Sequence, residues 1–452
     1  MMKSIHEPAR EIPVAYDCDL CVIGGSCTGV FAAVRAARLG MSVALVESNI
    51  LLGGMATAAQ VNEWHSLYDA THQQQIIGGL TAEVLDRLRR KHALVDLMRE
   101  ERGPYALFNS AALALELDAL VQEHESIRVF LKAACVGGIR EGNALTAAIL
   151  EDKSGRRAIR ARMFVDASGD GDLLRRTGFA AWRNETLQPV SYQLLIAGLE
   201  QIEERTGKGI WSQIRHLSKD FDYPLENATP WINPSHVPAD IRNVYGPRLN
   251  GVDASNADEV TAAILESRRC HRALLEMIKS RLGQEVAAVS LAHSLGVRET
   301  WHARCMHRLT ASDLLDGISF SDRIGRGTYP VDIHSSQGTL LRYLNGKEKV
   351  LDRDGKVTWR RWREDMGSSP TSYEIPYRCL VPESAENLLV AGRLLDADRE
   401  AYGGVRVMVN MNQTGEAAGV AAWWALKQGV TVTQVNPREL RRALADGGSL
   451  VP

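Results

Sequence analysis

The stretch Leu20–Glu47, LCVIGGSCTGVFAAVRAARLGMSVALVE, decides the fold of this chain. It opens with a short apolar, β-branched run, Leu20–Gly25, that ends in glycines, a pattern typical of a buried parallel strand. Val30–Leu39 combines small and apolar residues, which predicts a helix packed closely on a sheet and ended by Gly40. Ser42–Val46 predicts a second strand. Together these pieces form a βαβ unit, so the sequence predicts an α/β fold.

The turn between the first strand and the helix reads GGSCTG at residues 24–29. A dinucleotide-binding fingerprint has the form Gly-x-Gly-x-x-Gly, and Gly24 and Gly29 match its first and third glycines. Ser26 occupies the second position, but serine is small and the N–H groups at the helix start would still face a pyrophosphate. Glu47 follows about 20 residues later, where an acid is expected to bind ribose hydroxyls, which favours FAD or NAD over NADP. The alternative is a plain α/β turn without a nucleotide.

Composition and charge exclude several classes of function. The 452 residues are enough for two domains, and 53 Lys and Arg nearly balance 55 Asp and Glu. Because no basic tail or long apolar run stands out, we expect no nucleic acid and no membrane as partner. Met1–Glu11 lacks the apolar core of a signal peptide, so the expected compartment is the cytoplasm. The seven scattered cysteines, including Cys18 and Cys21 within a predicted strand, indicate neither a disulfide framework nor a metal site.

Beyond the second strand, Leu51–Thr57 reads LLGGMAT, and from here the chain resembles the FAD-dependent oxidoreductases, in particular the bacterial group often described only by that name. The resemblance covers most of the chain. Its other motifs, in order, are Ile76-Ile77-Gly78-Gly79, Phe164–Asp172 (FVDASGDGD), Leu295–Thr300 (LGVRET), Tyr329–His334 (YPVDIH), Ile375–Cys379 (IPYRC), Asn387–Arg393 (NLLVAGR) and Val405–Met408 (VRVM). The resemblance implies a Rossmann-like FAD-binding domain of the glutathione-reductase type, with an inserted α+β substrate domain.

Two of these motifs can also be interpreted from their residues. In the first, Met163–Ala167 predicts a strand, residues 168–171 a tight turn, and Asp172 a helix cap. Such a turn places N–H groups at the carboxyl end of a strand, where α/β sheets bind ligands, although it could also be a simple connection. The Gly/Ala-rich stretch Asn412–Ala425 predicts a helix. By resemblance its start faces the flavin pyrimidine, where the helix dipole stabilises negative charge on the reduced ring.

The expected FAD-binding residues come from the fingerprint, the two strand ends and the return segment. They are Gly24, Gly25, Ser26, Cys27, Gly29, Glu47, Ser48, Gly53, Gly54, Met55, Thr57, Val136, Ala167, Ser168, Gly169, Asp170, Gly392, Arg393, Met408 and Asn412. Many flavoprotein hydroxylases carry Gly-Asp where this chain has Gly392-Arg393, and the closer relatives carry Gly-Arg. The difference therefore counts against the hydroxylase branch and not against FAD.

The FAD-binding pieces are interrupted by a middle segment rich in Trp, His, Pro and charge. We therefore predict a first FAD-binding part at 14–180, a substrate domain at 181–375, a return segment at 376–430, and a C-terminal helix and tail at 431–452. The substrate domain is predicted to contain two strands of one sheet and a long helix, at Ser191–Leu199, Val286–Ser290 and Asp258–Leu282.

Three residues are candidates for catalysis. His334 in YPVDIH could act as the base that takes a proton while hydride goes to the flavin, and the alternative is a structural histidine. Arg298 in VRET could hold an anion or a carbonyl oxygen, unless it pairs with Glu299. Arg406 could face the flavin or the substrate, or pair structurally. His65 and His72 follow the Gly-Gly pair, a region where related dehydrogenases can attach flavin covalently, but no motif for this is present.

The resulting hypothesis is an FAD-dependent oxidoreductase that carries out two-electron oxidation or reduction of a small organic substrate. No second glycine fingerprint follows a strand, so the electron acceptor is expected to be oxygen, a quinone or another protein. A flavin-dependent isomerase, dehydratase or hydratase is one alternative, and a non-catalytic dinucleotide-binding protein is another. The sequence leaves the substrate, the acceptor and a homo-oligomeric state open.

Overall fold

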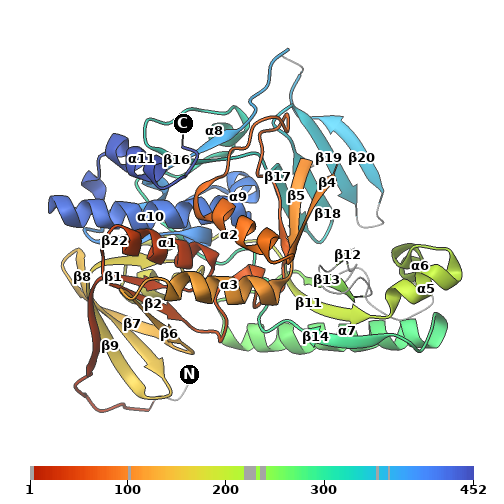
Figure 1. Ribbon diagram of the computed structural model, residues 1–452, viewed down its shortest axis with the longest axis horizontal. Coiled ribbons are helices and arrows are strands. Elements are labelled where there is room, and N and C mark those ends of the chain that lie inside the picture. The colour runs from red at the N-terminus through yellow and green to blue at the C-terminus, as the bar shows by residue number, and fades with distance from the viewer. Residues whose placement is uncertain are drawn as a thin grey trace.

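The computed structural model describes residues 5–99, 103–217, 231–234, 241–352, 356–364 and 367–451. A seven-stranded sheet forms its base, at the lower left of Figure 1, and confirms the predicted α/β fold with a parallel core. Five parallel strands lie in the order β6 (Ile127–Leu131), β2 (Val43–Glu47), β1 (Val14–Ile23), β9 (Gly155–Asp166) and β22 (Leu388–Val390). Strand β22 pairs with the second half of β9. On the same edge, the first half of β9 pairs with β8 (Ala144–Asp152) in an antiparallel manner, and β8 pairs with β7 (Ala134–Glu141) in the same way.

Strand β22 carries the C-terminal part of the chain back into this sheet. It pairs in parallel with the end of β9, with Leu388 opposite Phe164 and Val390 opposite Asp166. A short 3-10 turn, Gly392–Leu394, follows directly. The FVDASGDGD and NLLVAGR motifs therefore lie side by side at the same edge of the sheet.

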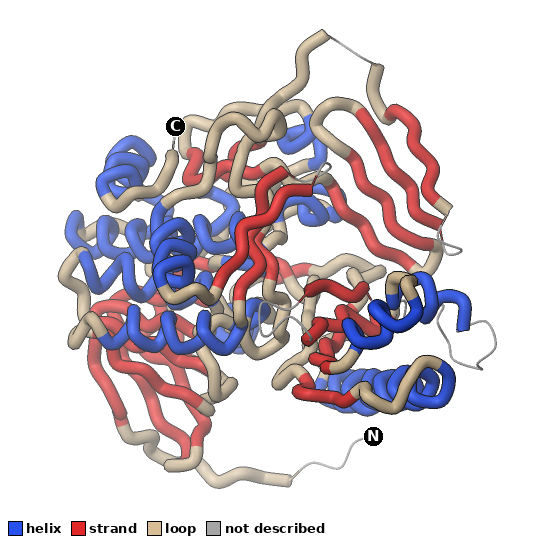
Figure 2. The backbone as a smooth tube through the Cα atoms, turned by 45° about the vertical axis from the view of Figure 1, so that its right-hand side comes forward, coloured by secondary structure: helices blue, strands red, loops and turns tan. Residues whose placement is uncertain are grey.

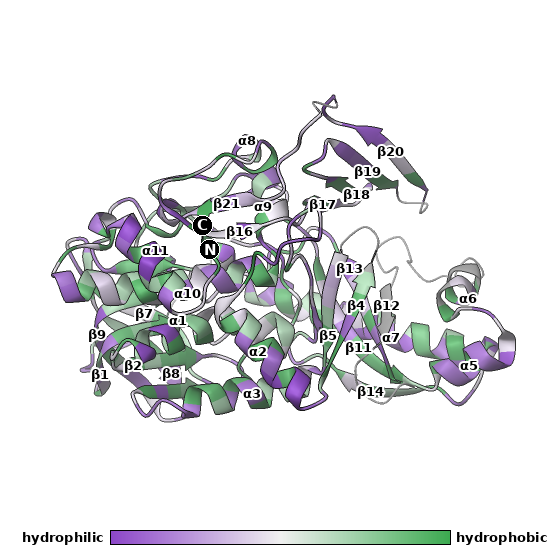
Figure 3. Ribbon diagram, turned by 45° about the horizontal axis from the view of Figure 1, so that its top comes forward, coloured by the Kyte–Doolittle hydropathy of each residue, from purple (hydrophilic) through white to green (hydrophobic). Residues whose placement is uncertain are grey.

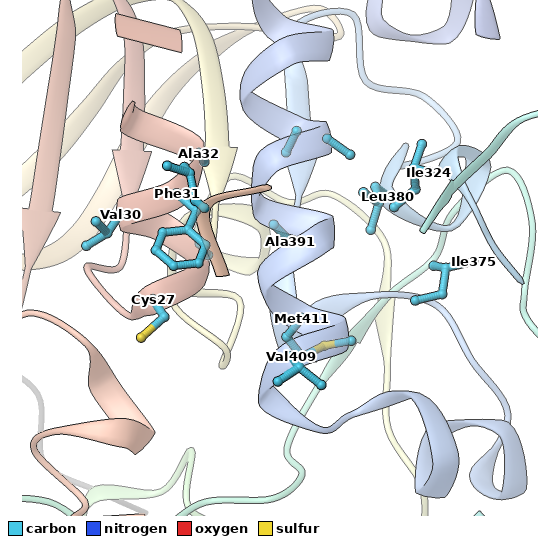
Figure 4. Close-up of a cluster of buried hydrophobic side chains, with 14 of the residues drawn as sticks. Cys27, Val30, Phe31, Ala32, Ile324, Ile375, Leu380, Ala391, Val409 and Met411 are labelled. Atoms are coloured by element: carbon cyan, nitrogen blue, oxygen red, sulfur yellow. The ribbon is translucent and has the colours of Figure 1, made fainter. Parts of the chain in front are cut away.

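Helices α1 (Cys27–Arg38) and α10 (Met408–Gln428) pack against each other above the sheet. Residues 27–37 of α1 are all buried, as expected for a helix covered on every side. The approach is close: a Cβ atom added to Gly415 would lie 2.0 Å from the Thr28 carbonyl oxygen. Figure 4 shows side chains of α1, among them Phe31, beside those of α10. Helix α10 begins at Met408, earlier than the predicted start at Asn412.

A small antiparallel sheet lies next to these helices. It consists of β3 (Glu63–Trp64), β5 (Gly103–Phe108) and β4 (Leu94–Arg99), in that order. Helices α2 (Gly79–Arg90) and α3 (Ser110–Gln122) flank it, and Asn109 caps α3 by accepting two backbone N–H groups.

The middle of the chain forms two separate sheets, both on the right of Figure 1. The lower sheet has the order β12 (Trp231–Pro234), β13 (Ile241–Leu249), β11 (Val190–Ala197) and β14 (Ala287–Leu291), with α5 (Leu199–Thr206), α6 (Ile210–Leu217) and α7 (Ala257–Arg281) beside it. The predicted strands at 191–199 and 286–290 are thus neighbours in one sheet, and the predicted long helix is α7. Figure 2 shows the upper sheet, a meander of β17 (Val331–Ser335), β18 (Gly338–Arg342), β19 (Lys347–Asp352) and β20 (Val357–Arg361).

Short elements complete the described fold. They are α4 (Asp172–Arg176), α8 (Ala311–Leu315), α9 (Arg399–Val405), α11 (Pro437–Asp446), and the strand pairs β10 (Ala181–Trp182) with β15 (His302–Ala303) and β16 (Arg323–Gly327) with β21 (Tyr373–Pro376). Figure 3 shows polar residues along α11 and β20, at the outside of the molecule. Gly403 of α9 packs closely against β17, since a Cβ atom added to it would lie 2.9 Å from the Asp332 carbonyl oxygen. This contact brings the end of α9 to the strand that carries His334.

Candidate active site

The turn after β1 has the geometry that a pyrophosphate-binding turn requires. Gly24 has φ 101°, and a Cβ there would lie 2.4 Å from the Ala167 carbonyl oxygen. A Cβ on Gly29 would lie 1.8 Å from the Gly24 carbonyl oxygen. Both positions require glycine. Gly24 adopts a left-handed backbone conformation, and Gly29 allows the helix to approach the strand closely.

Ser26, which replaces the second glycine of the fingerprint, is the N-cap residue of α1. Its side chain makes no capping hydrogen bond, so the first-turn N–H groups of the helix are not taken by it. The Gly53 N–H donates to the Gly25 carbonyl oxygen at 2.8 Å, which places the second Gly-Gly pair beside the helix start. Uncapped N–H groups at the positive end of a helix dipole suit a phosphate group. The residues here therefore fit the pyrophosphate of FAD.

Glu47 fixes the fingerprint turn from the end of β2. Its Oε2 accepts the Gly25 N–H at 2.7 Å, and its Oε1 accepts the Asn49 N–H at 2.7 Å. The Ser48 hydroxyl lies 3.3 Å from Oε1. Because a carboxylate can accept about four hydrogen bonds, Oε2 keeps an acceptor position, and the ribose contact of Glu47 remains a prediction.

The second glycine turn, at residues 168–170, is joined to the return segment by an ion pair. Arg393 Nη2 lies 3.1 Å from Asp170 Oδ1, and the Thr300 hydroxyl donates to the same oxygen at 2.7 Å. A Cβ on Gly169 would lie 2.4 Å from Arg393 Nη2. Arg393 Nη1 is buried and finds no hydrogen-bond partner among the described residues, which suits an acceptor supplied by a bound cofactor. The structure thus brings together two of the sequence motifs that were expected to surround FAD, and it adds Thr300 of the LGVRET motif to them.

The predicted cap of α4 is wrong. Asp172 is the first helical residue, and the N-cap is Gly171 with φ 73° and no side-chain bond. Two N–H groups of the first turn donate to Asp166 Oδ2, while the Ser168 hydroxyl oxygen accepts the N–H groups of Gly171 and Asp172. Asp166 reaches the helix start from the last position of β9, so it performs the capping that was assigned to Asp172.

Three other predicted FAD residues occupy different surroundings. Val136 lies at an irregularity of β7 where the register with β8 shifts, and it is half-buried. Met408 is the first residue of α10, whose N-cap residue also makes no side-chain capping bond. The Asn412 side chain points toward α2, where its amide donates to the Thr81 hydroxyl at 3.2 Å. A flavin contact of Asn412 would therefore involve its backbone.

Two of the three catalytic candidates, His334 and Arg406, come from different motifs and meet at Asp332. His334 Nε2 lies 3.3 Å from Asp332 Oδ2, and Arg406 Nη2 lies 3.2 Å from the same oxygen. The Tyr329 hydroxyl donates to it at 2.6 Å. Asp332 and His334 are two residues apart on β17, so both side chains are on one face of the strand. Arg406 reaches them from the end of α9.

Arg298 joins this cluster from a different loop. Its Nη1 donates to the Pro189 carbonyl oxygen at 2.8 Å, and the Tyr402 hydroxyl donates to the Arg298 carbonyl oxygen at 2.7 Å. Burial, together with the nearby charges of Arg248 and Arg406, lowers the pKa of Arg298 to about 9. The cluster therefore holds several positive charges close together.

The alternative interpretation of Arg298, a salt bridge with Glu299, is wrong. The Glu299 carboxylate accepts the Asn184 amide and the Gln188 backbone N–H, and it lies 3.2 Å from His302 Nε2. Glu299 is almost fully buried among these partners. Arg298 and Glu299 are adjacent in sequence, but their side chains contact different residues.

Burial and charge set the protonation of the pair on β17. Burial raises the pKa of Asp332, but the charge of Arg406 and the hydrogen bonds from His334 and the Tyr329 hydroxyl outweigh it and hold that pKa well below its usual value. Burial lowers the pKa of His334 well below its ordinary value, and Arg248 adds to the shift. At neutral pH the site therefore holds an ionised carboxylate and a neutral imidazole that can accept a proton.

Of the two histidines considered for flavin attachment, one lies at the cluster. The His65 ring is tilted against Tyr329, with centroids 4.7 Å apart, and its Nδ1 lies 3.0 Å from the Ser66 hydroxyl. His72 lies against Gly103 of β5 instead. The structure thus places His65, and not His72, next to the catalytic candidates.

Sequence reasoning missed several residues of the site. Asp332 and Tyr329 belong to the same YPVDIH motif as His334, and the two-residue spacing on a strand could have identified Asp332. Gln188 donates to the Asp332 carbonyl oxygen and accepts the His334 N–H. Arg248 lies 3.4 Å from His334 Nδ1. Neither residue carries a local signal, because each reaches the site through the packing of separate sheets.

Within the described ranges, no three His, Cys, Asp or Glu side chains gather in a way that could hold a metal ion. In the same part of the chain, no helix is long and apolar enough to cross a membrane.

Comparisons with known proteins show what the chain is similar to. Residues 19–444 match the model of a family described as FAD dependent oxidoreductase. A stretch of 71 residues is 41% identical to mitochondrial dihydrolipoyl dehydrogenase of Caenorhabditis elegans and spans only 14% of this chain and 14% of that protein. A geranylgeranyl bacteriochlorophyll reductase-like protein of Thermoplasma acidophilum is 12% identical, with TM-score 0.47 over 95% of this chain and 83% of the other. The p-nitrophenol 4-monooxygenase of Pseudomonas putida is 10% identical, with TM-score 0.45 over 95% of this chain and 84% of the other.

Proposed function

This chain belongs to the FAD dependent oxidoreductase family, and from that premise we propose that it transfers two electrons, as a hydride, between a small organic substrate and FAD. One observation carries the proposal for the site: His334, Arg298 and Arg406, from three separate motifs, gather around Asp332. A proton acceptor and cations for a substrate oxygen are what such a reaction requires of the protein.

FAD would be held by the fingerprint turn at residues 24–29, the Gly53-Gly54 pair, the turn at residues 168–170 and Arg393. When bound, it supplies the group that accepts or donates the hydride. The uncapped start of α1 and the orphaned Nη1 of Arg393 support this placement.

The proton of the substrate would go to His334. Asp332 accepts the Nε2–H, which leaves Nδ1 as the basic nitrogen. The Thr339 hydroxyl lies 2.8 Å from Nδ1 and can pass the proton from the substrate to it. Asp332 then stabilises the imidazolium that forms, and Arg298 holds the substrate oxygen.

The test is flavin reduction by substrate under anaerobic conditions. Purified wild-type protein should contain FAD that passes to the supernatant after acid precipitation, and an active compound should bleach its absorption. His334→Gln should keep FAD and lose about 10²-fold or more in the rate of bleaching, whereas the exposed control His6→Gln should not. Absence of FAD, or equal rates in both variants, contradicts the proposal.

Turnover with an artificial electron acceptor separates net redox from isomerase or hydratase chemistry. We expect one two-electron acceptor to be consumed for each substrate molecule. Product formed without consumption of the acceptor would replace the proposal with the non-redox alternative.

We also propose the cytoplasm as the compartment. All seven cysteines, Cys18, Cys21, Cys27, Cys135, Cys270, Cys305 and Cys379, are free and buried. Free thiols in this number are usual where the surroundings are reducing. Fractionation of cells that produce the protein is the measurement that decides it.

A further inference from the structure

One arginine at the site, Arg298, has no ion pair in the part of the chain that the structure describes. Arg406 pairs with Asp332, which also receives the Tyr329 hydroxyl and lies 3.3 Å from His334 Nε2. Among the residues that the structure describes, Arg298 makes no ion pair and donates to a neutral carbonyl oxygen. Arg248 adds a further guanidinium, 3.4 Å from His334 Nδ1.

Burial of the Arg298 guanidinium is unfavourable without an anion beside it. Burial lowers the pKa of Arg298 to about 9, and the nearby charges of Arg248 and Arg406 add to the shift. Asp332 acts in the opposite direction, but its ion pair is with Arg406. A negatively charged group of the substrate would supply a direct partner for Arg298.

We infer that the substrate carries a carboxylate, which binds to the guanidinium of Arg298 with Arg248 beside it, while its reacting atoms face His334. A planar carboxylate matches the two parallel N–H groups that a guanidinium can present. One carboxylate would also supply the ion pair that Arg298 lacks among the described residues. This inference rests on the proposed function and names the substrate class for that site.

Binding of simple carboxylates to the oxidised holoenzyme tests the inference without turnover. Acetate, succinate and benzoate would be titrated at constant ionic strength, with acetamide, succinamide and benzamide as neutral matches. The readouts are the flavin difference spectrum and the thermal stability of the holoenzyme. We expect saturable changes in at least one readout with carboxylates and none with the amides.

The variants locate the binding site. In Arg298→Met the dissociation constant for the carboxylates should rise about tenfold or more, as for the loss of a charge-assisted hydrogen bond. Arg248→Met provides a second variant in case the first loses FAD, and a smaller rise is expected. Arg272→Met, on the exposed side of α7, should bind like the wild type.

The inference is overturned if both readouts are silent for all three carboxylates, if amides bind equally, or if neither site variant changes the affinity. Inorganic phosphate in the same titration should bind more weakly than the carboxylates, and tighter binding of phosphate would also overturn the inference. A holoenzyme that is bleached by a neutral substrate but binds no carboxylate would contradict only this inference. A protein that holds no FAD would contradict the proposed function itself.

Discussion

At Asp332 a single side chain joins the Tyr329 hydroxyl, Arg406 and His334. Asp332→Asn keeps the shape of the side chain but removes its charge, so His334 loses the partner that fixes its tautomer and stabilises its protonated form. We expect the rate of flavin reduction to fall about 10²-fold or more, with FAD still bound. Anaerobic stopped-flow absorption measures this rate. The exposed control Asp446→Asn should react like the wild type.

The lowered pKa of His334 predicts a specific pH profile. Free histidine changes charge near pH 6.5, but burial keeps His334 neutral to lower pH. Flavin reduction at saturating substrate should therefore stay constant between about pH 6 and pH 8, without the inflection of an ordinary histidine. A fall in rate centred near pH 6.5 that is absent in His334→Gln would show that His334 titrates normally.

At the scale of elements, the contact between α1 and α10 depends on small residues. A Cβ on Gly415 would lie 2.0 Å from the Thr28 carbonyl oxygen, so Gly415→Ala must push the helices apart. We expect a loss of about 1–3 kcal/mol in the free energy of unfolding, together with weaker FAD retention. Thermal unfolding and the ratio of flavin to protein absorption measure both. Gly137→Ala, where a Cβ would meet only Ile149 at 3.8 Å, is the matched control.

The elements differ in how far the sequence predicts them. The βαβ unit is encoded by local patterns and was predicted correctly, and so were the two neighbouring strands β11 and β14. The start of α10 and the cap of α4 were not, because both depend on contacts outside the local sequence. The α4 cap is supplied by Asp166, from the end of a neighbouring strand. Local propensity gives no information on such partners.

In the candidate site, too, some residues lie in local sequence motifs and others are brought in by distant contacts. His334, Arg298 and Arg406 lie in motifs with a local signature, and the structure brings them close together, while their catalytic roles stay a prediction. Arg248 and Gln188 come from the lower sheet and the segment before it, and they reach His334 only through tertiary packing. The sequence contains no pattern that relates these distant segments.

At the scale of the whole molecule, Glu416 of α10 joins three separate parts of the chain. Its carboxylate accepts the Leu80 N–H at the start of α2 and the Ser449 hydroxyl in the C-terminal tail, and it lies 3.7 Å from Arg35 Nε of α1. Arg35 in turn donates to carbonyl oxygens at the end of α11, among them that of Gly447. The contacts of Glu416 and Arg35 therefore connect α1, α2, α10, α11 and the C-terminal tail.

This pair makes the stability of the protein depend on pH. Burial raises the pKa of Glu416 from 4.5 to about 7, so folding favours its protonated form. Its contribution is complete below pH 4.5 and is lost as the pH rises toward 7. Between pH 5 and pH 7.5, Glu416→Gln should therefore gain stability relative to the wild type, by as much as about 3 kcal/mol. Denaturant unfolding at both pH values measures this. The exposed control Glu439→Gln should show no such gain.

The late position of β22 and α10 in the chain has a consequence for biosynthesis. The glycine fingerprint leaves the ribosome long before the strand that pairs with the end of β9 and the helix that packs on α1. The nascent chain therefore exposes the apolar face of α1 until α10 has been made. We expect a chain that is cut short before Leu388 to lack both elements and to retain no flavin.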